Sequence, residues 1–225
     1  MDQQPRQPVV LRAREERKAP GHRDTPFHIY LSHASADFLL VERVWRIMES
    51  IGLRAYMYEH YTHPGRCARD AVIDTLRDSA EVVCFLTEAG AGSAWVHQEL
   101  GAGQAMGKPL IPWLQTDGPQ APGFAVLDNA ILYLPSKPDH AIAELIWLVR
   151  HDFELFDGPL TVDCPACKSF AELPLPGMEQ TSNAMQRNEI LGPHQCPRCL
   201  GLIYLSPCTL EPIAEQRALS RAWAE

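Results

Sequence analysis

The chain has 225 residues, of which 46% are hydrophobic and 21% are charged, proportions typical of an ordinary globular protein. They exclude a largely disordered or fibrous chain. With 20 Lys and Arg against 28 Asp and Glu, the formal net charge is −8, which disfavours general binding to the phosphate backbone of nucleic acids. No stretch approaches the roughly 20 consecutive apolar residues that a membrane-spanning helix needs, so we expect no membrane partner.

The composition changes twice along the chain, which predicts three regions. Residues 1–25 hold six basic and four acidic residues with three prolines and no apolar period, and we expect a flexible leader there in place of a signal peptide. Residues 26–155 are expected to form the main domain. Residues 156–225 contain two pairs of cysteines, which predict a small metal-binding module followed by a short helix over residues 210–223. Since no export signal is present, we expect a cytoplasmic protein with reduced thiols.

Short apolar runs alternate with amphipathic segments throughout the main domain. Strands are expected at residues 27–31, 53–57, 82–86, 108–113 and 130–133, and helices at residues 38–51, 68–79, 94–106 and 138–151. Residues 89–93 are expected to be a glycine-rich connection. Because strands and helices alternate, the predicted fold class is α/β, with a doubly wound parallel sheet and right-handed crossovers.

The spacing of apolar residues also predicts which side of each helix is buried. The predicted buried stripes are Leu40, Val44, Ile47 and Ile51; Ala68, Val72 and Leu76; and Ile142, Leu145, Ile146 and Val149. Gly52 is expected to end the first helix.

The carboxyl ends of parallel strands are where ligands gather, and Trp95 and Glu99 lie in a helix that begins at this edge. A spacing of four residues places the indole and the carboxylate on one helix face. This pair suits a cationic pyridinium ring, because the indole face attracts the cation and the carboxylate stabilises positive charge at an anomeric carbon. The alternative interpretation is a core tryptophan beside a solvated glutamate.

Four segments, in this order and spacing, resemble Toll/interleukin-1 receptor (TIR) domains: residues 27–37, the loop that ends in Pro64 and Gly65, residues 93–99 and residues 107–112. The resemblance covers roughly residues 26–152. It implies a flavodoxin-like five-stranded parallel sheet and either cleavage of NAD, by hydrolysis or cyclisation, or assembly without catalysis. In the NAD-cleaving members the catalytic glutamate ends a W-x-x-x-E stretch, which places that role on Glu99 and the tryptophan on Trp95.

Position in the TIR pattern also suggests other substrate-binding residues. Ser32, His33 and Ser35 are expected to line the ribose and diphosphate side, since short polar groups at a strand-to-helix turn donate to anions. The alternative for Ser35 and Asp37 is a capping role at the start of the next helix. The loop over residues 58–66 resembles one that closes over a neighbouring subunit's pocket, although Tyr58 replaces its frequent acidic residue.

The four paired cysteines Cys164, Cys167, Cys196 and Cys199 form two C-P-x-C segments that predict a zinc ribbon. Four thiolates complete a closed tetrahedral set, so the zinc is expected to be structural. A redox C-x-x-C pair is the weaker alternative, because a single such motif would suffice for that chemistry.

The leading hypothesis is therefore a NAD-cleaving enzyme of the NAD glycohydrolase or ADP-ribosyl cyclase type, resembling bacterial TIR proteins of anti-phage defence. It would act as a self-associating protein whose zinc ribbon docks a protein partner. The rival hypothesis is a non-enzymatic TIR scaffold that works by TIR–TIR association. A nucleic-acid-binding ribbon is disfavoured, because residues 156–225 hold five basic and eight acidic side chains.

Overall fold

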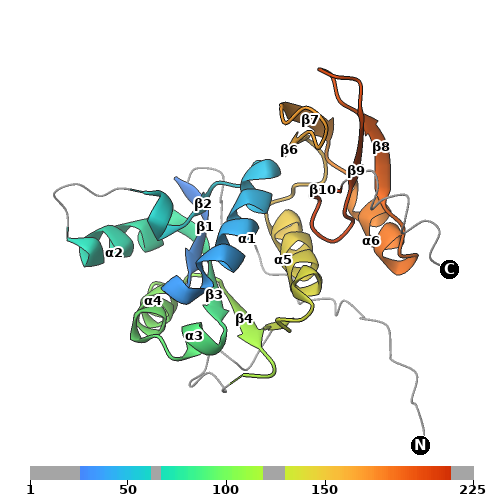
Figure 1. The fold of residues 1–225 in the computed structure, drawn as a ribbon. Coiled ribbons are helices and arrows are strands. Elements are labelled where there is room, and N and C mark those ends of the chain that lie inside the picture. The colour runs from blue at the N-terminus through green and yellow to red at the C-terminus, as the bar shows by residue number, and fades with distance from the viewer. Residues whose placement is uncertain (1–25, 62–66, 119–129, 214–225) are drawn as a thin grey trace, which may run out of the picture.

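The structure is a computed structural model that describes residues 26–61, 67–118 and 130–213 (Figure 1). The expected leader over residues 1–25 and most of the expected helix over residues 210–223 lie outside these ranges. The first region contains β1 (Phe27–Ser32), η2 (Ser35–Asp37), α1 (Phe38–Ser50), β2 (Ala55–Tyr56), η3 (Tyr58–His60), α2 (Ala68–Asp78), β3 (Ser79–Leu86), α3 (Glu88–Ala91), α4 (Ala94–Ala105), β4 (Leu110–Gln115), β5 (Ile131–Tyr133) and α5 (Pro138–Asp152).

The five strands form one parallel sheet in the order β2-β1-β3-β4-β5. β3 lies at its centre, and all eight of its residues are buried. Such a strand has helices on both faces, which explains its continuous apolar sequence. The predicted doubly wound α/β fold is confirmed.

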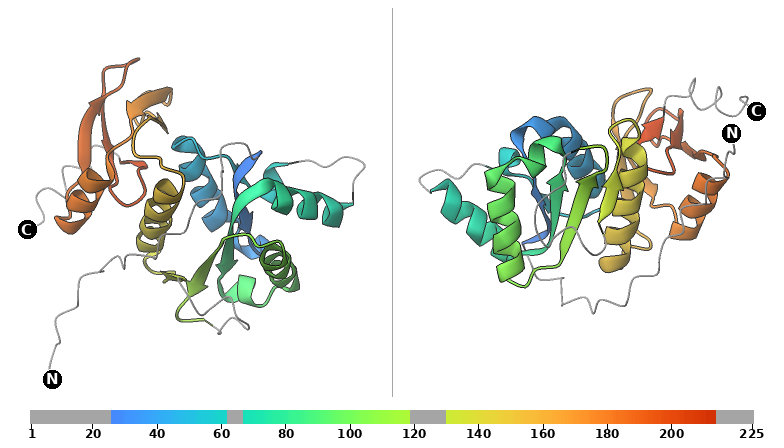
Figure 2. Two further views of the ribbon diagram at one scale, coloured as in Figure 1. Left: turned by 180° about the vertical axis from the view of Figure 1, so that it is seen from behind. Right: turned by 90° about the horizontal axis from the view of Figure 1, so that it is seen from below.

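Helices cover both faces of this sheet (Figures 1 and 2). On one face, α1 and α5 pack on side chains such as Ile29, Val83 and Trp113. On the other face, α2 and α4 pack on Tyr30, Val82 and other residues of the neighbouring strands. The expected buried stripe of α5 is confirmed, and Gly52 ends α1 region with a φ of 83°, a conformation that favours glycine.

Some expected elements differ in the structure. β2 has two residues where five were expected, although Leu53 and Met57 at its flanks are buried. Ala68 is exposed, and Thr75 joins the buried side of α2 in its place. The expected connection at residues 89–93 contains the short helix α3, where a Cβ on Gly90 would lie 1.8 Å from the Phe85 carbonyl oxygen. That glycine therefore permits a close backbone approach and does not mark a loop.

The C-terminal region forms two small antiparallel sheets and one helix: β6 (Pro159–Asp163), β7 (Phe170–Pro174), α6 (Met178–Gln186), β8 (Leu191–Gln195), β9 (Leu202–Leu205) and β10 (Pro212–Ile213). β6 pairs with β7, and the second sheet has the order β10-β9-β8. Residues 212 and 213 are thus a strand, so the helix expected from residue 210 is wrong at its start.

This C-terminal region packs on the α1 and α5 side of the parallel sheet (Figures 1 and 2). Leu160, Ile203 and Leu205 belong to the same buried cluster as the apolar residues of α1 and α5. Arg150 at the end of α5 is 2% exposed and donates hydrogen bonds to the carbonyl oxygens of Leu155 and Pro176, at 3.0 and 2.8 Å. The two regions therefore share one core.

Among the helices in the described residues, none has the length and apolar character that crossing a membrane requires.

Candidate functional site

Glu99 lies in the middle of α4 and faces the sheet. α4 begins after Ser93, whose hydroxyl accepts a hydrogen bond from the backbone N–H of Val96 at 3.3 Å. Val96, Leu100 and Gly103 are buried on the same helix, and Glu99 lies among these positions with only 5% of its surface exposed. A buried carboxylate is costly unless polar groups compensate for the lost water.

Two hydroxyl groups of β1 supply that compensation. The Tyr30 hydroxyl donates to Glu99 Oε1 at 2.7 Å, and the Ser32 hydroxyl donates to Oε2 at 2.6 Å. Residues two apart on a strand point to the same face, which is why both hydroxyls reach one carboxylate. Both carboxylate oxygens are therefore held in fixed positions.

Burial and hydrogen bonding act on the pKa of Glu99 in opposite directions. Burial raises this pKa above its ordinary value of 4.5, while hydrogen bonds from Ser32, Tyr30 and Trp95 oppose the rise. Burial and the nearby Glu99 carboxylate raise the pKa of Tyr30 as well, so its hydroxyl keeps its proton and remains a donor.

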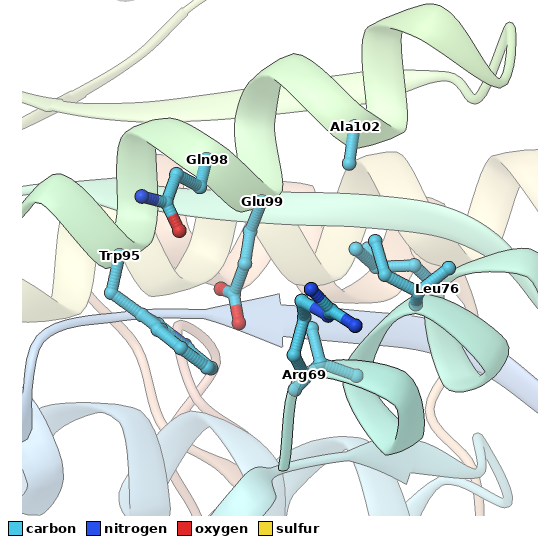
Figure 3. A pocket seen from close by; sticks show the side chains of 8 residues that line it. Arg69, Leu76, Trp95, Gln98, Glu99 and Ala102 are labelled. Carbon is cyan, nitrogen blue, oxygen red and sulfur yellow. The ribbon is translucent and has the colours of Figure 1, made fainter. Parts of the chain in front are cut away.

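Trp95 lies one helical turn before Glu99 and is 42% exposed. Both side chains point into one pocket between α2 and α4, as Figure 3 shows. The alternative of a core tryptophan beside a solvated glutamate is therefore wrong, because the tryptophan is half-exposed and the glutamate is buried.

The pocket has a volume of about 50 Å³. It is lined by Arg69, Val72, Ile73 and Leu76 of α2 and by Trp95, Gln98, Glu99 and Ala102 of α4. One wall is thus apolar and the other carries polar groups. This volume holds only one or two water molecules, so the described part of the chain does not by itself enclose a nucleotide.

The residues expected on the ribose and diphosphate side do not all meet at this pocket. Ser32 faces Glu99, as described above. The ring of His33 is buried, with Nδ1 3.0 Å from the Leu31 carbonyl oxygen and Nε2 3.2 Å from Glu59 Oε1. Ser35 is exposed in η2. Neither His33 nor Ser35 is among the residues that line the pocket.

The capping alternative for Asp37 holds by position but not by contact. Asp37 is the N-cap residue of α1, yet its side chain makes no capping hydrogen bond. Its carboxylate instead accepts a hydrogen bond from the Thr87 hydroxyl at 2.7 Å. Asp37 therefore ties the turn after β1 to the turn after β3.

Sequence analysis missed three residues of this site: Tyr30, Arg69 and Gln98. Tyr30 was detectable from strand periodicity, because it lies two residues before Ser32 on an expected strand. Gln98 and Arg69 carry no comparable signal, since an exposed polar residue on a helix is ordinary and its proximity to Glu99 depends on how α2 packs against α4.

The loop after β2 is described only in its first part. η3 covers Tyr58–His60, and residues 62–66 lie outside the described residues. Glu59 of this loop pairs with His33, and the ring of His60 stacks on Trp45 at 4.2 Å between centroids. Tyr61 stacks on Tyr56, whose ring in turn stacks on Tyr30.

The four cysteines form a compact group at the other site. The Sγ atoms of Cys164, Cys167, Cys196 and Cys199 all lie within 4.8 Å of one another. Cys164 Sγ is 3.7 Å from Cys199 Sγ, and Cys167 Sγ is 3.9 Å from Cys196 Sγ. In a tetrahedral site with Zn–S bonds of roughly 2.3 Å, sulfur atoms lie about 3.8 Å apart, so the spacing fits zinc.

Each cysteine pair lies on a turn of the same design. In the turn at Cys164, the backbone N–H of Lys168 donates to the Cys164 carbonyl and the Cys164 N–H donates to the Ser169 carbonyl, both at 2.9 Å. The turn at Cys196 repeats this pattern with Leu200 and Gly201. Lys168 and Leu200 have φ values of 58° and 61°.

A third turn, Ser206–Glu211, repeats the same backbone design without the paired thiols. Leu210 has a φ of 59°, its N–H donates to the Ser206 carbonyl at 2.9 Å, and the Ser206 N–H donates to the Glu211 carbonyl at 2.9 Å. Ser206 and Thr209 occupy the two cysteine positions, and Pro207 matches the proline of both other turns. Cys208 lies between them and is not part of the four-cysteine group.

The chain was compared with known proteins. The family model described as the TIR domain matches residues 29–146. A search among curated proteins found no significant match.

Solved structures with a similar chain include three with a TIR-like arrangement. The TIR domain of the Toll-related receptor TRR-2 from Hydra magnipapillata is 13% identical, with a TM-score of 0.48, over 55% of this chain and 98% of that one. A TIR-STING receptor from C. gigas is 20% identical, with a TM-score of 0.43, over 54% and 40%. The CMP N-glycosidase BcmB of Clostridium botulinum is 18% identical, with a TM-score of 0.40, over 53% and 98%.

These TM-scores are below 0.5, so the assignment rests on the family model and on the strand order. The matched residues make up just over half of the chain and contain all five strands of the parallel sheet. The chain belongs to the TIR-domain family.

Proposed function

We propose that the protein cleaves the N-glycosidic bond of NAD, with Glu99 as the catalytic residue. The observation that supports this most strongly is the buried Glu99 carboxylate, held at both oxygens by Tyr30 and Ser32, beside the half-exposed ring of Trp95. A surface used only for protein association has no need of a carboxylate with this burial.

The chemistry of NAD fits such a pair. The bond between ribose C1′ and the nicotinamide nitrogen breaks, its electron pair leaves with neutral nicotinamide, and C1′ becomes oxocarbenium-like. A fixed carboxylate stabilises that positive charge, and water or a nitrogen of the adenine then adds to C1′. The indole of Trp95 stacks with the cationic pyridinium ring before cleavage.

The zinc ribbon has a structural role in this proposal. Four thiolates leave no open coordination position, and the ribbon packs on the sheet face opposite to α2 and α4. We propose that Cys164, Cys167, Cys196 and Cys199 hold one zinc ion and that the ribbon docks a protein partner. Reduced thiols fit a cytoplasmic protein, and the proposed context is anti-phage defence signalling.

The test is NAD turnover by the purified full chain at high protein concentration, with mass analysis of the products. Cleavage to nicotinamide and either linear or cyclic ADP-ribose is expected. Glu99→Gln should lower turnover by about 10²- to 10³-fold, because a preorganised electrostatic contact with the transition state is lost. Glu88→Gln, which changes an exposed glutamate on α3, is the matched control and should keep full turnover.

The rival proposal is a TIR scaffold without catalysis. It predicts that the wild type leaves NAD intact at every concentration while still self-associating. Equal turnover in the wild type and Glu99→Gln would remove the catalytic role from Glu99.

A further inference from the structure

The charged side chains that line the pocket are Glu99 and Arg69. Ser32 is committed to the Glu99 carboxylate, and His33 is held by the Leu31 carbonyl and Glu59. The polar residues at the turn after β1 therefore do not offer a cationic contact to a phosphate in this pocket. Arg69 is the cation among the described lining residues.

Arg69 is placed so that an anion can reach it. It lies in the first turn of α2, and its side chain is 78% exposed. Its printed partner is the neighbouring Asp70, at 3.1 Å, whose side chain is 56% exposed. An exposed pair of this kind contributes little and is readily exchanged for a phosphate, which Arg binds through two parallel hydrogen bonds.

The order of side chains in the pocket matches the order of groups in a nucleotide. In Figure 3, Trp95 and Arg69 lie on either side of the Glu99 carboxylate. In a nucleotide, the base and the 5′-phosphate lie at opposite ends of one ribose. A base on Trp95 with C1′ at Glu99 therefore directs the 5′-phosphate toward Arg69.

We propose that Arg69 is an anion-binding residue that recognises the 5′-phosphate of the substrate and makes this pocket select nucleotides over nucleosides. The inference rests on the proposed function for the identity of the base, and it adds the group that the site recognises on the other end of the ribose. Arg69 touches the substrate at a distance from the bond that breaks, so its contribution is to binding and specificity.

Three substrates with the same leaving group test this. NAD, nicotinamide mononucleotide and nicotinamide riboside share the glycosidic bond to nicotinamide, and the riboside lacks the 5′-phosphate. Arg69→Gln should lower kcat/KM for NAD and for the mononucleotide by about 10- to 100-fold, the loss of one charge-assisted contact, and leave the riboside unchanged. Equal losses for all three substrates, or no loss for NAD, would overturn the proposal.

Arg77→Gln is the matched control. Arg77 lies at the other end of α2, is exposed, and pairs with Asp74 at 2.9 Å as Arg69 pairs with Asp70. It does not line the pocket. This variant should keep the selectivity of the wild type, and an equal loss of selectivity in both variants would show a general charge effect and overturn the specific role.

A binding measurement separates this inference from the proposed function. Calorimetry with the full chain carrying Glu99→Gln should show tighter binding of the mononucleotide than of the riboside, and adding Arg69→Gln should remove the difference. If this holds while the wild type shows no turnover, the catalytic proposal fails and the phosphate-binding role of Arg69 stands. If the mononucleotide does not bind, or binds equally with and without Arg69, the inference fails whatever the turnover.

Discussion

Arg43 of α1 and Glu211 of the segment before β10 form a bidentate ion pair across the boundary between the parallel sheet region and the zinc ribbon. Arg43 Nε lies 3.1 Å from both Glu211 carboxylate oxygens, and Nη2 lies 2.6 Å from Oε2. Nη1 donates to Asp139 of α5 at 2.8 Å. One guanidinium thus joins α1, α5 and the ribbon.

We expect Arg43→Met to lower the free energy of unfolding by about 1 kcal/mol, because two carboxylates lose their shared partner while solvent screens the half-exposed pair. Arg46→Met is the control, since Arg46 is more exposed and pairs only within α1, with Glu42. Urea denaturation measures both. The same midpoint for the two variants would show that the ion pair adds nothing across the boundary.

Loss of zinc should act on both regions. Cys196→Ser is expected to reduce the zinc content measured by elemental analysis and to unfold the C-terminal module, while the parallel sheet remains folded. Because Leu160, Ile203 and Leu205 share a buried cluster with α1 and α5, hydrogen exchange in those two helices should also increase. Freshly purified wild type without bound metal would contradict the zinc assignment.

The pH dependence of turnover should report the environment of Glu99. Since burial raises its folded pKa above 4.5 and the ionised form is the active one, activity should appear only as the pH rises through that raised value. Tyr30→Phe removes a hydrogen bond that favours the ionised carboxylate, so the acidic limb should move to higher pH. An unchanged acidic limb in this variant would show that Tyr30 does not tune Glu99.

The same shift has a consequence for stability. A carboxyl group whose folded pKa lies above its unfolded pKa loses folding free energy as the pH rises from the unfolded value through the folded one. Glu99→Gln removes this loss and should therefore unfold at a higher temperature than the wild type at neutral pH. A difference that disappears below pH 4 would identify ionisation of Glu99 as the cause.

Trp95 should contribute to binding more than to stability. Trp95→Ala is expected to weaken NAD binding and to lower the free energy of unfolding by much less than the roughly 3–5 kcal/mol that truncation of a buried aromatic residue costs. Trp113→Ala provides that comparison, because Trp113 is fully buried beneath α1 and α5. Thermal unfolding of both variants separates the two situations, and equal losses would return Trp95 to a packing role.

Turnover should depend on self-association. The described pocket is too small to enclose a dinucleotide, and resemblance to enzymatic TIR domains suggests that a neighbour's loop over residues 58–66 completes it. Specific activity should therefore rise with protein concentration, in parallel with the mass measured by light scattering. Constant activity per chain down to a monomeric dilution would contradict a shared site.

The sequence predicts the parallel sheet because its signals are local and periodic. The apolar run at residues 82–86 and the stripe from Ile142 to Val149 each reflect one element packed against its neighbours. The predicted order of strands also needed only the rules of right-handed crossovers. By contrast, the shortening of β2 and the helix at residues 88–91 depend on close tertiary contacts, such as Gly90 against the Phe85 carbonyl.

The site was predictable only along the helix that carries it. A spacing of four residues brings Trp95 and Glu99 together in any α-helix, so this pair needed no tertiary information. The contacts of Glu99 with β1 and the approach of Arg69 from α2 depend on how three elements pack. His33 was expected at a phosphate, but its two ring nitrogens are held by groups that lie 2 and 26 residues away in sequence.

The turn Ser206–Glu211 bears on what zinc does in the ribbon. It has the backbone hydrogen bonds and the left-handed residue of both cysteine turns, with hydroxyl side chains where they have thiols. Its conformation is therefore encoded by the local sequence and does not require a metal. Zinc would then hold two preformed turns at a fixed separation, and the metal-free ribbon would keep its local turns while the β6–β7 hairpin and the β8–β9 hairpin lose their relative orientation.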